Sequence, residues 1–411
     1  MDRIILHYDL NYFYANVEML YHPETRDLPI AVGGDAEKRH GIILAKNPLA
    51  KSFGIKTGEA LWQAKKKCPN LLIYPATTDK YSKFSKKVKR ISMDYSDKIE
   101  SFGIDEAWLD ITHTAHLFGT PLHLAFILKE RIKRELGVTI SIGISYNKVF
   151  AKLASEYGGV DTITLINRKN KGELIDPLDV GKLLFIGRKT VIKLNTLNIN
   201  TIGDLALASP QLLLKHFGKV GTAMYLYANG LDESDVISED RVPKSVGNSS
   251  TTVNDMFTYQ DIYLVLSVLS QSVATRLKKQ NLKGRCLTLN IRTKDLVWSS
   301  FQTTLSEHTN LYSDIIKTAF ALLQKHYRLE TPLRSIGVSL NQLIKDASMQ
   351  QLSLFEQKEK DRSFTLENTI DEIRNRFGYS TVDYAILKLN EKLTDFAPST
   401  EQFVFPSGNK S

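Results

Sequence analysis

Hydrophobic and polar positions in the first part of the chain alternate between strand-like and helix-like patterns. The β-prone runs are residues 3–8, 28–32, 41–44, 98–102, 107–112 and 138–146. The helix-like patterns are residues 13–20, 62–67, 81–94 and 122–136. A tight connection at residues 103–106 joins two of the runs. This alternation predicts a layered α/β unit with helices packed on a sheet.

The pattern then changes twice. Residues 167–240 hold short helices broken by glycines, as in IGRKT (186–190) and FGKVG (217–221). Residues 241–343 combine three β-prone runs with two long amphipathic helices. The apolar stripe of the first helix is Ile262, Val265, Leu266, Leu269 and Val273. A polar stretch and a helical pair broken at Gly378 follow. We therefore expect a multidomain α/β protein.

Length and composition narrow the class of protein. A chain of 411 residues exceeds one ordinary core, so two to four domains are expected. Lys and Arg outnumber Asp and Glu by 54 to 45, and the resulting charge of +9 favours a polyanionic partner. Cys68 and Cys286 lie far apart without metal-site spacing, which fits a reducing cytoplasm. No segment has the length of a signal peptide core or membrane span, so a cytoplasmic protein is expected.

Three carboxylates stand at the ends of predicted strands. Asp9 follows the first strand, and Asp105 and Glu106 occupy the connection between two later ones. If these strands are neighbours, the carboxylates converge into the clustered oxygen ligands that Mg²⁺ prefers. Two such ions could activate an attacking hydroxyl and stabilise a leaving pyrophosphate. Taken alone, an Asp after a strand is more often a helix cap, and an Asp-Glu pair in a turn is more often solvated. The flanking residues are therefore needed to identify a metal site.

Three flanking motifs resemble those of the Y-family translesion DNA polymerases. DLNYFYA and the following VE, within residues 9–18, resemble the opening motif of that family. IDEAWLD (104–110) resembles its second metal-binding motif. GISYNK and AKLA, within residues 143–154, resemble the strand-to-helix segment that closes the palm. The motifs occur in the family's order, and the resemblance covers about residues 3–343.

The resemblance implies a right-hand polymerase that extends DNA on a template with low fidelity during translesion synthesis and the SOS response. Its expected parts are a palm (1–20 and 75–166), small fingers (21–74), a helical thumb with a helix-hairpin-helix (167–240), an α/β little finger (241–343), and a linker with a clamp-binding peptide and C-terminal helices (344–411). No stretch is left for a proofreading exonuclease.

The resemblance also implies roles for the residues of the opening motif. Two Mg²⁺ ions, with Mn²⁺ as a substitute, are expected to bind the carboxylates of Asp9, Asp105 and Glu106 and the carbonyl of Leu10. Asn11 stands where many members have a second Asp and is not counted as a ligand. The remaining expected nucleotide-binding residues of this motif are Tyr12, Phe13 and Tyr14. Tyr14 falls on the steric gate that excludes a ribose 2′-hydroxyl, whereas Phe13 is equally well explained as a core residue.

The expected triphosphate contacts are less regular. Many members have Tyr and Arg where this chain has Pro48 and Lys51, and a lysine lacks the bidentate fork of arginine. This pattern places the chain closer to the UmuC-like (ImpB/MucB/SamB) branch than to bacterial polymerase IV. Polymerase IV members have a Lys-Pro pair where this chain has Gly158 and Gly159. Lys148 and Lys152 are the candidates to replace that lysine.

Primer-template DNA and a sliding clamp are the expected macromolecular partners, and a deoxynucleoside triphosphate is the expected substrate. The expected DNA-contacting residues are Gly187, Arg188, Gly218, Gly221, Lys244, Lys283, Arg285, Arg292 and Arg334, which would bind phosphates without reading sequence. The expected clamp peptide is Gln351, Leu352, Ser353, Leu354 and Phe355. Whether a recombinase filament or an accessory subunit is also required stays open.

Two other functions are compatible with parts of the sequence. The GGDAE stretch (33–37) superficially resembles the signature of palm-type nucleotide cyclases, but it lacks the final Phe. A clamp-tethered DNA-binding scaffold without catalysis is the second, and retention of all three carboxylates argues against it.

Overall fold

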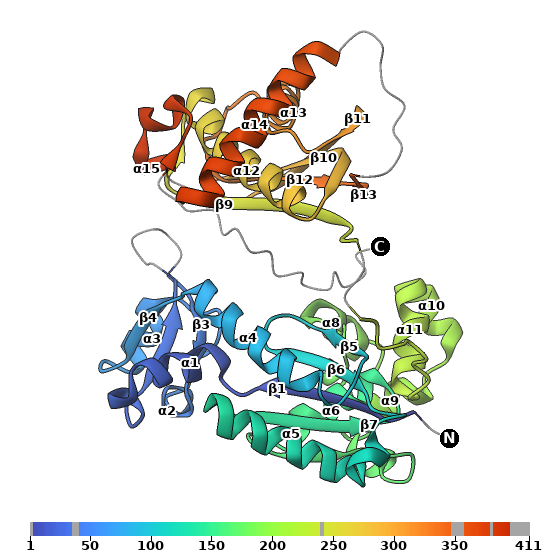
Figure 1. Ribbon diagram of the computed structural model, residues 1–411. Coiled ribbons are helices and arrows are strands. Elements are labelled where there is room, and N and C mark those ends of the chain that lie inside the picture. Colours follow the sequence, from blue (N-terminus) through green and yellow to red (C-terminus); the bar gives the residue numbers. More distant parts are fainter. Residues whose placement is uncertain (1–2, 35–40, 239–241, 347–356, 379–380, 395–411) are drawn as a thin grey trace. The chain divides into compact units, whose positions relative to one another are not determined.

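A computed structural model describes residues 3–34, 41–238, 242–346, 357–378 and 381–394 (Figure 1). The chain folds into two compact units. Almost all described residues up to 238 belong to the first unit, and those from 242 onward belong to the second.

The palm sheet lies at the centre of the first unit. Its strands, in spatial order, are β5 (Ile99–Ser101), β6 (Glu106–Asp110), β1 (Ile5–Leu10), β7 (Ile140–Ser145) and β8 (Ile163–Leu165). The strand β1 is almost wholly buried, as its apolar run predicts for a strand between two neighbours. It pairs antiparallel with both β6 and β7. The start of the chain therefore forms the middle of the sheet.

Helices cover both faces of this sheet. They are α1 (Phe13–Tyr21), α4 (Thr78–Ser92), α5 (Pro121–Leu136) and α6 (Lys148–Tyr157), with the turn η2 (Ala115–Phe118). Leu6 and Tyr8 share a core with residues of α4 and α5. Ile5 instead packs near Ala151 of α6. Because strand side chains alternate, Asp9 points to the same face as Ile5, toward α6.

The fingers form a smaller sheet with two short helices. The elements are η1 (Pro23–Thr25), β2 (Ile30–Gly33), β3 (Ile43–Lys46), β4 (Leu72–Pro75), α2 (Pro48–Ser52) and α3 (Leu61–Lys67). The strand order is β3-β2-β4. Asn47 caps α2 by accepting from Ala50 N–H, and the same oxygen accepts from Ile30 N–H of β2. One side chain thus ties the basic helix α2 to the sheet.

The predicted thumb consists of short helices around a core that they share with residues of α6, among them Phe150 and Leu153. The helices are α7 (Lys171–Leu174), η3 (Val180–Lys182), α8 (Arg188–Asn195), α9 (Ile202–Leu207), α10 (Pro210–Phe217) and α11 (Lys219–Ala228). Gly breaks separate several of them, as the sequence predicts.

The second unit is a four-stranded antiparallel sheet packed on two long helices. Its strands, in spatial order, are β11 (Trp298–Thr309), β10 (Leu282–Thr293), β12 (Leu333–Asn341) and β9 (Ser245–Met256), and β13 (Ile344–Lys345) pairs with β10. The helices are α12 (Tyr259–Lys279) and α13 (Tyr312–His326). Thr258 and Asp261 form a capping box at the start of α12. The apolar stripe that predicted α12 is buried against the sheet.

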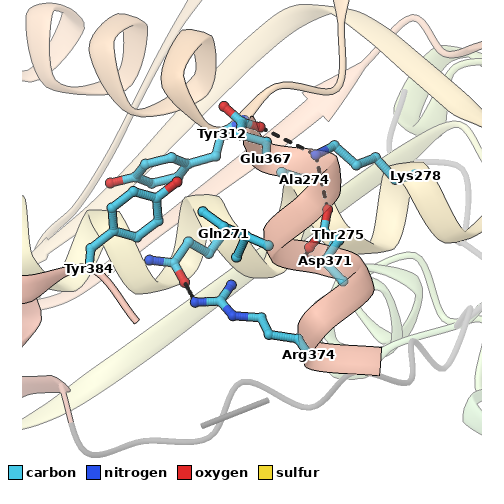
Figure 2. A pocket seen from close by; sticks show the side chains of 10 residues that line it. Gln271, Ala274, Thr275, Lys278, Tyr312, Glu367, Asp371, Arg374 and Tyr384 are labelled. Carbon is cyan, nitrogen blue, oxygen red and sulfur yellow. Dashed lines mark hydrogen bonds and ion pairs between the residues drawn. The ribbon is translucent and has the colours of Figure 1, made fainter. Parts of the chain in front are cut away.

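The C-terminal elements α14 (Gln357–Phe377), η5 (Ala385–Leu389) and α15 (Glu391–Thr394) belong to the same unit. Figure 2 shows Lys278 of α12 between two carboxylates of α14, Glu367 at 3.3 Å and Asp371 at 3.0 Å. The buried Glu367 also accepts from the backbone N–H groups of Tyr312 and Ser313, which begin α13. The region expected after residue 343 therefore packs on the little-finger unit.

Candidate active site

The register of the palm strands brings the three predicted carboxylates together. Asp9 pairs with Glu106 of β6 on one side and with Ser141 of β7 on the other. The carbonyl of Asp105 accepts a 2.9 Å hydrogen bond from Leu10 N–H. The sequence predicted that the three carboxylates converge if their strands are neighbours. The strand order β6-β1-β7 meets that condition.

Burial and mutual repulsion make two of these carboxylates difficult to ionise. Burial raises the pKa of Asp9 from its ordinary 3.8 to about 7, and the charges of Asp105 and Glu106 add to the effect. Burial, with the charge of Glu106, raises the pKa of Asp105 to about 6. A cation beside this pair would relieve the repulsion.

Glu106 differs because it has nitrogen-bearing partners. Lys152 Nζ, from α6, donates a hydrogen bond to the Glu106 carboxylate. His7 Nε2 lies 3.2 Å from the same carboxylate. Burial acts to raise the pKa of Glu106, but His7 and Lys152 together outweigh it, and the pKa is lowered. Glu106 is therefore the most readily ionised of the three carboxylates.

His7 is a site residue that sequence reasoning missed. It is fully buried, and its Nδ1 lies 2.8 Å from Ser155 Oγ of α6. The Ser155 hydroxyl donates in turn to the Lys152 carbonyl. Burial lowers the pKa of His7. The only signal in the sequence was its period-two spacing from Asp9, which places both on one face of β1.

The site offers oxygen ligands suited to a divalent cation, but these ligands do not form a closed coordination shell. Within the described ranges, no three His, Cys, Asp or Glu side chains stand ready to enclose a metal ion. Asp9 and Asp105 present hard oxygens and repel each other, which fits Mg²⁺. Glu106 would have to release Lys152 in order to join them.

Tyr14, the predicted steric gate, is held by an aromatic partner. Its ring stacks on Tyr81 of α4 at a centroid distance of 4.3 Å and an interplanar angle of 17°. The Tyr81 hydroxyl donates a 2.7 Å hydrogen bond to the buried Glu18, which Lys80 also contacts at 2.8 Å. The predicted helix began at Tyr81, whereas α4 begins at Thr78 and also includes Lys80, and no role was expected from the sequence for either residue.

The other two aromatic residues of the motif are placed differently. Phe13 is 4% exposed and packs in the palm core, which favours the alternative that it is a core residue, and its nucleotide contact stays a prediction. Tyr12 has a left-handed backbone, with φ of 48°, at the turn before α1. Lys51 Nζ lies 5.9 Å from the centre of the Tyr12 ring. The fingers therefore bring one cation to the side of the site where the triphosphate is expected.

The two candidate palm lysines separate. Lys152 contacts Glu106, as described. Lys148 Nζ lies 2.7 Å from both carboxylate oxygens of Glu100, beyond the end of β7 that pairs with Ile5. Ile5 and Asp9 are four positions apart on β1, roughly 13 Å along a strand. The pairing with Glu100 argues against a triphosphate contact for Lys148, and the role expected from its sequence position stays a prediction.

The thumb glycines fall into two kinds. A Cβ at Gly187 or Gly218 would meet nothing within 4 Å, so the backbone is open at the starts of α8 and α11. Such open N–H groups suit a phosphate. Arg188 begins α8 and is exposed. A Cβ at Gly221 would lie 2.2 Å from the Leu213 carbonyl, so this glycine is required by the packing of α10 on α11.

The predicted cations of the second unit differ in how they are held. Lys244 is exposed and Arg334 is half-buried. Lys283 pairs with Asp346 at 2.5 Å. Arg285 donates to the Leu305 carbonyl, and Arg292 lies over the Trp298 ring. The predicted clamp peptide, 351–355, lies outside the described residues.

Comparison with known proteins agrees with the fold. Residues 8–156 match the impB/mucB/samB family, and residues 243–354 match the impB/mucB/samB family C-terminal domain. A DNA polymerase IV of Acetivibrio thermocellus is 44% identical, over 94% of this chain and 98% of that protein. A DNA polymerase IV of Clostridium acetobutylicum is 35% identical, over 95% of this chain and 100% of that protein.

A solved Y-family DNA polymerase chimera has the same fold, with a TM-score of 0.76 and 24% identity. The match covers 83% of this chain and 99% of the chimera, which confirms the expected fold class. In the described part of the chain, no helix has the length and apolarity needed to cross a membrane. From the extent of these matches, the chain belongs to the impB/mucB/samB family of Y-family DNA polymerases.

Proposed function

We propose that this chain, a translesion DNA polymerase by its family, joins a deoxynucleotide to a primer 3′-hydroxyl in a reaction assisted by two Mg²⁺ ions. The observation that carries the proposal is the convergence of Asp9, Asp105 and Glu106 at one end of the palm sheet. The carboxylates and the Leu10 carbonyl would hold the ions, and Mn²⁺ could replace Mg²⁺. Bound ions would stabilise the negative charge on the triphosphate and on the attacking oxygen.

The chain's own residues would prepare the site. His7 and Lys152 lower the pKa of Glu106, so its carboxylate would be ionised and could bind a cation once Lys152 releases it. Tyr14, fixed by Tyr81, would exclude a ribose 2′-hydroxyl. Lys51 would bind the triphosphate as a point charge, and Tyr12 would line the same space.

DNA would be held by both units. The open backbone at Gly187 and Gly218, with Arg188, would bind phosphates from the thumb. In the second unit, the predicted phosphate contacts stay Lys244, Lys283, Arg285, Arg292 and Arg334, which suit a grip that is sensitive to salt. The QLSLF segment would bind a sliding clamp, whereas a recombinase or accessory partner stays open.

The finer classification is also a proposal. Asn11 and Lys51 support the UmuC-like branch, while the matched relatives named above are called DNA polymerase IV. Two buried free thiols, Cys68 and Cys286, support a cytoplasmic location. Low fidelity and the lack of proofreading are proposed from the resemblance to the Y-family polymerases.

Primer extension on a synthetic template tests the proposal. Wild-type protein with Mg²⁺ should add deoxynucleotides, and Asp105→Ala should lose at least about 100-fold in rate. An inactive wild type that still binds primer-template DNA would support the scaffold. Formation of a cyclic dinucleotide from GTP would support the cyclase. Full activity of Asp105→Ala would show that the metal assignment is wrong.

A further inference from the structure

Asn11 belongs to a hydrogen-bond network to which the proposed reaction assigns no role. Its Nδ2 donates to Ser141 Oγ at 2.8 Å, and its Oδ1 accepts from Asp161 N–H at 3.0 Å. The Ser141 hydroxyl donates onward to the Gly159 carbonyl at 2.5 Å. The network therefore joins the end of β1 to β7 and to the turn that follows α6.

The direction of each hydrogen bond follows from the groups that can act only as a donor or only as an acceptor. A backbone N–H can only donate, so Asp161 requires an acceptor at Asn11. A carbonyl can only accept, so the single proton of Ser141 goes to Gly159. Ser141 must then receive its proton from Asn11. A carboxylate at position 11 has no proton to give, so the structure explains why an amide stands there.

Both ends of the network are anchored. The Asp161 carboxylate binds Lys129 at 2.9 Å and Lys133 at 2.7 Å, both from α5. On the other side, Asn11 N–H donates to the Thr139 carbonyl, and the Asn11 carbonyl accepts from Asn16 Nδ2. The turn around Asn11 is therefore held on its side-chain side and on its backbone side.

This turn connects the two halves of the proposed site. Asp9 and Leu10 precede Asn11 on β1, and Tyr14 follows it on α1. Between them Tyr12 has a left-handed backbone, which is unfavourable for a bulky residue and persists only when its surroundings enforce it. The bonds of Asn11 hold the chain just before Tyr12, and the hydrogen bond from Asn16 N–H to the Tyr12 carbonyl holds it just after.

We propose that Asn11, acting through Ser141 and Asp161, is a positioning residue that sets the separation between the metal-holding strand end and Tyr14. The proposal rests on the proposed function. Displacement of reacting groups by about 1 Å can cost about 100-fold in rate. We therefore expect loss of the network to reduce the rate of nucleotide addition about tenfold or more, with little change in DNA affinity.

An isosteric pair at Ser141 tests the proposal. Ser141→Thr keeps the hydroxyl, whereas Ser141→Val has nearly the same shape without it. Ser145→Val is the matched control, because Ser145 lies on the same strand, is equally buried, and has an Oγ with no hydrogen-bond partner within the described part of the chain. In single-turnover primer extension, Ser141→Val should be about tenfold slower, while Ser141→Thr and Ser145→Val should stay within about threefold of wild type.

The coupling of the pair separates positioning from a general loss of packing. The effects on the rate should not add in the double variant Asn11→Ala, Ser141→Val, because either single change already breaks the bond between Asn11 and Ser141. The ratio of deoxy- to ribonucleotide addition should also fall, since Tyr14 moves relative to the strand end. Equal rates for Ser141→Val and Ser145→Val would overturn the proposal.

The hydrogen-exchange rate of the Asp161 amide is a second measurement, and it does not depend on polymerase activity. Asn11→Ala should accelerate this exchange about tenfold or more, and Ser145→Val should not. If Ser141→Val does not fold, Asn11→Ala carries both measurements. A wild type without polymerase activity would end the proposed function, whereas unchanged Asp161 exchange in Asn11→Ala would end the network itself.

Discussion

Asp9→Asn should stabilise the metal-free protein while removing activity. The pKa of Asp9 is raised from 3.8 to about 7, so folding opposes its ionisation. A shift of this size corresponds to about 4 kcal/mol at a pH above 7. Because Asp105 and Glu106 share the repulsion and can relax, we expect about 2 kcal/mol from replacing Asp9 by its neutral isostere.

The pH dependence gives the sign of this effect. Below pH 3.8 the carboxyl is protonated in folded and unfolded chains, and the wild type suffers no penalty. As the pH rises toward about 7, the unfolded chain loses its proton first, so wild-type stability falls. The advantage of Asp9→Asn should therefore be absent near pH 4 and fully developed at pH 8.

Thermal unfolding with a chelator, at pH 5 and pH 8, measures the difference. We expect Asp9→Asn to melt about 4 °C or more above wild type at pH 8. Asp204→Asn is a control of opposite sign, because hydrogen bonds from the backbone of Thr201 and Asn200 lower the pKa of Asp204. It should melt below wild type at pH 8.

Added Mg²⁺ completes the test. A ligand that binds only the folded protein raises its melting temperature, so Mg²⁺ should stabilise wild type more than Asp9→Asn. If Asp9→Asn is no more stable than wild type in chelator at pH 8, the carboxylates do not repel as described. If Mg²⁺ raises both melting temperatures equally, the ions bind elsewhere.

Three further changes have expected outcomes. Gly143→Ala should lower the free energy of unfolding by at least about 3 kcal/mol in denaturant unfolding, because its Cβ would lie 1.9 Å from a backbone oxygen of α6. Gly172→Ala is the control and should be nearly neutral, because the nearest atom to its Cβ would be 3.7 Å away. Equal losses of stability in the two variants would contradict the close packing at Gly143. Tyr81→Leu removes the ring that stacks on Tyr14, so selection of deoxy- over ribonucleotides should fall about tenfold in competition assays, and an unchanged ratio would show that Tyr14 needs no support. Lys152→Met removes the cation that lowers the carboxylate pKa values, so activity should fall at pH 7 and recover toward pH 9; a pH–rate profile identical to wild type would refute this role.

Periodicity succeeded where one face of an element is apolar. The stripe that begins at Ile262 predicted α12, and the run after Arg3 predicted β1, because these residues fill the cores. It failed for β9, whose sequence SVGNSSTTVNDM is rich in serine and threonine. An edge strand with polar residues has no continuous apolar run, and only its pairing with β12 reveals it.

The motifs predicted the carboxylates but not their surroundings. Position in sequence placed Lys148 and Lys152 together, yet helix α6 carries one to Glu100 and the other to Glu106. In the sequence, His7 looks like a polar residue that interrupts an apolar strand. In the structure, its Nε2 lies beside the Glu106 carboxylate. Contacts of this kind depend on which strands pair and which helix covers them.

Neighbouring residues were enough to predict acidic residues at strand ends on a layered α/β frame, because strand ends and local motifs are encoded locally. The folded structure was needed to show which acid ionises most readily, which aromatic ring is free of the core, and why position 11 is an amide. Those properties come from burial and from hydrogen bonds between segments up to 150 positions apart, such as Asn11 and Asp161. Local sequence carries no record of such distances, so they appear only once the chain has folded.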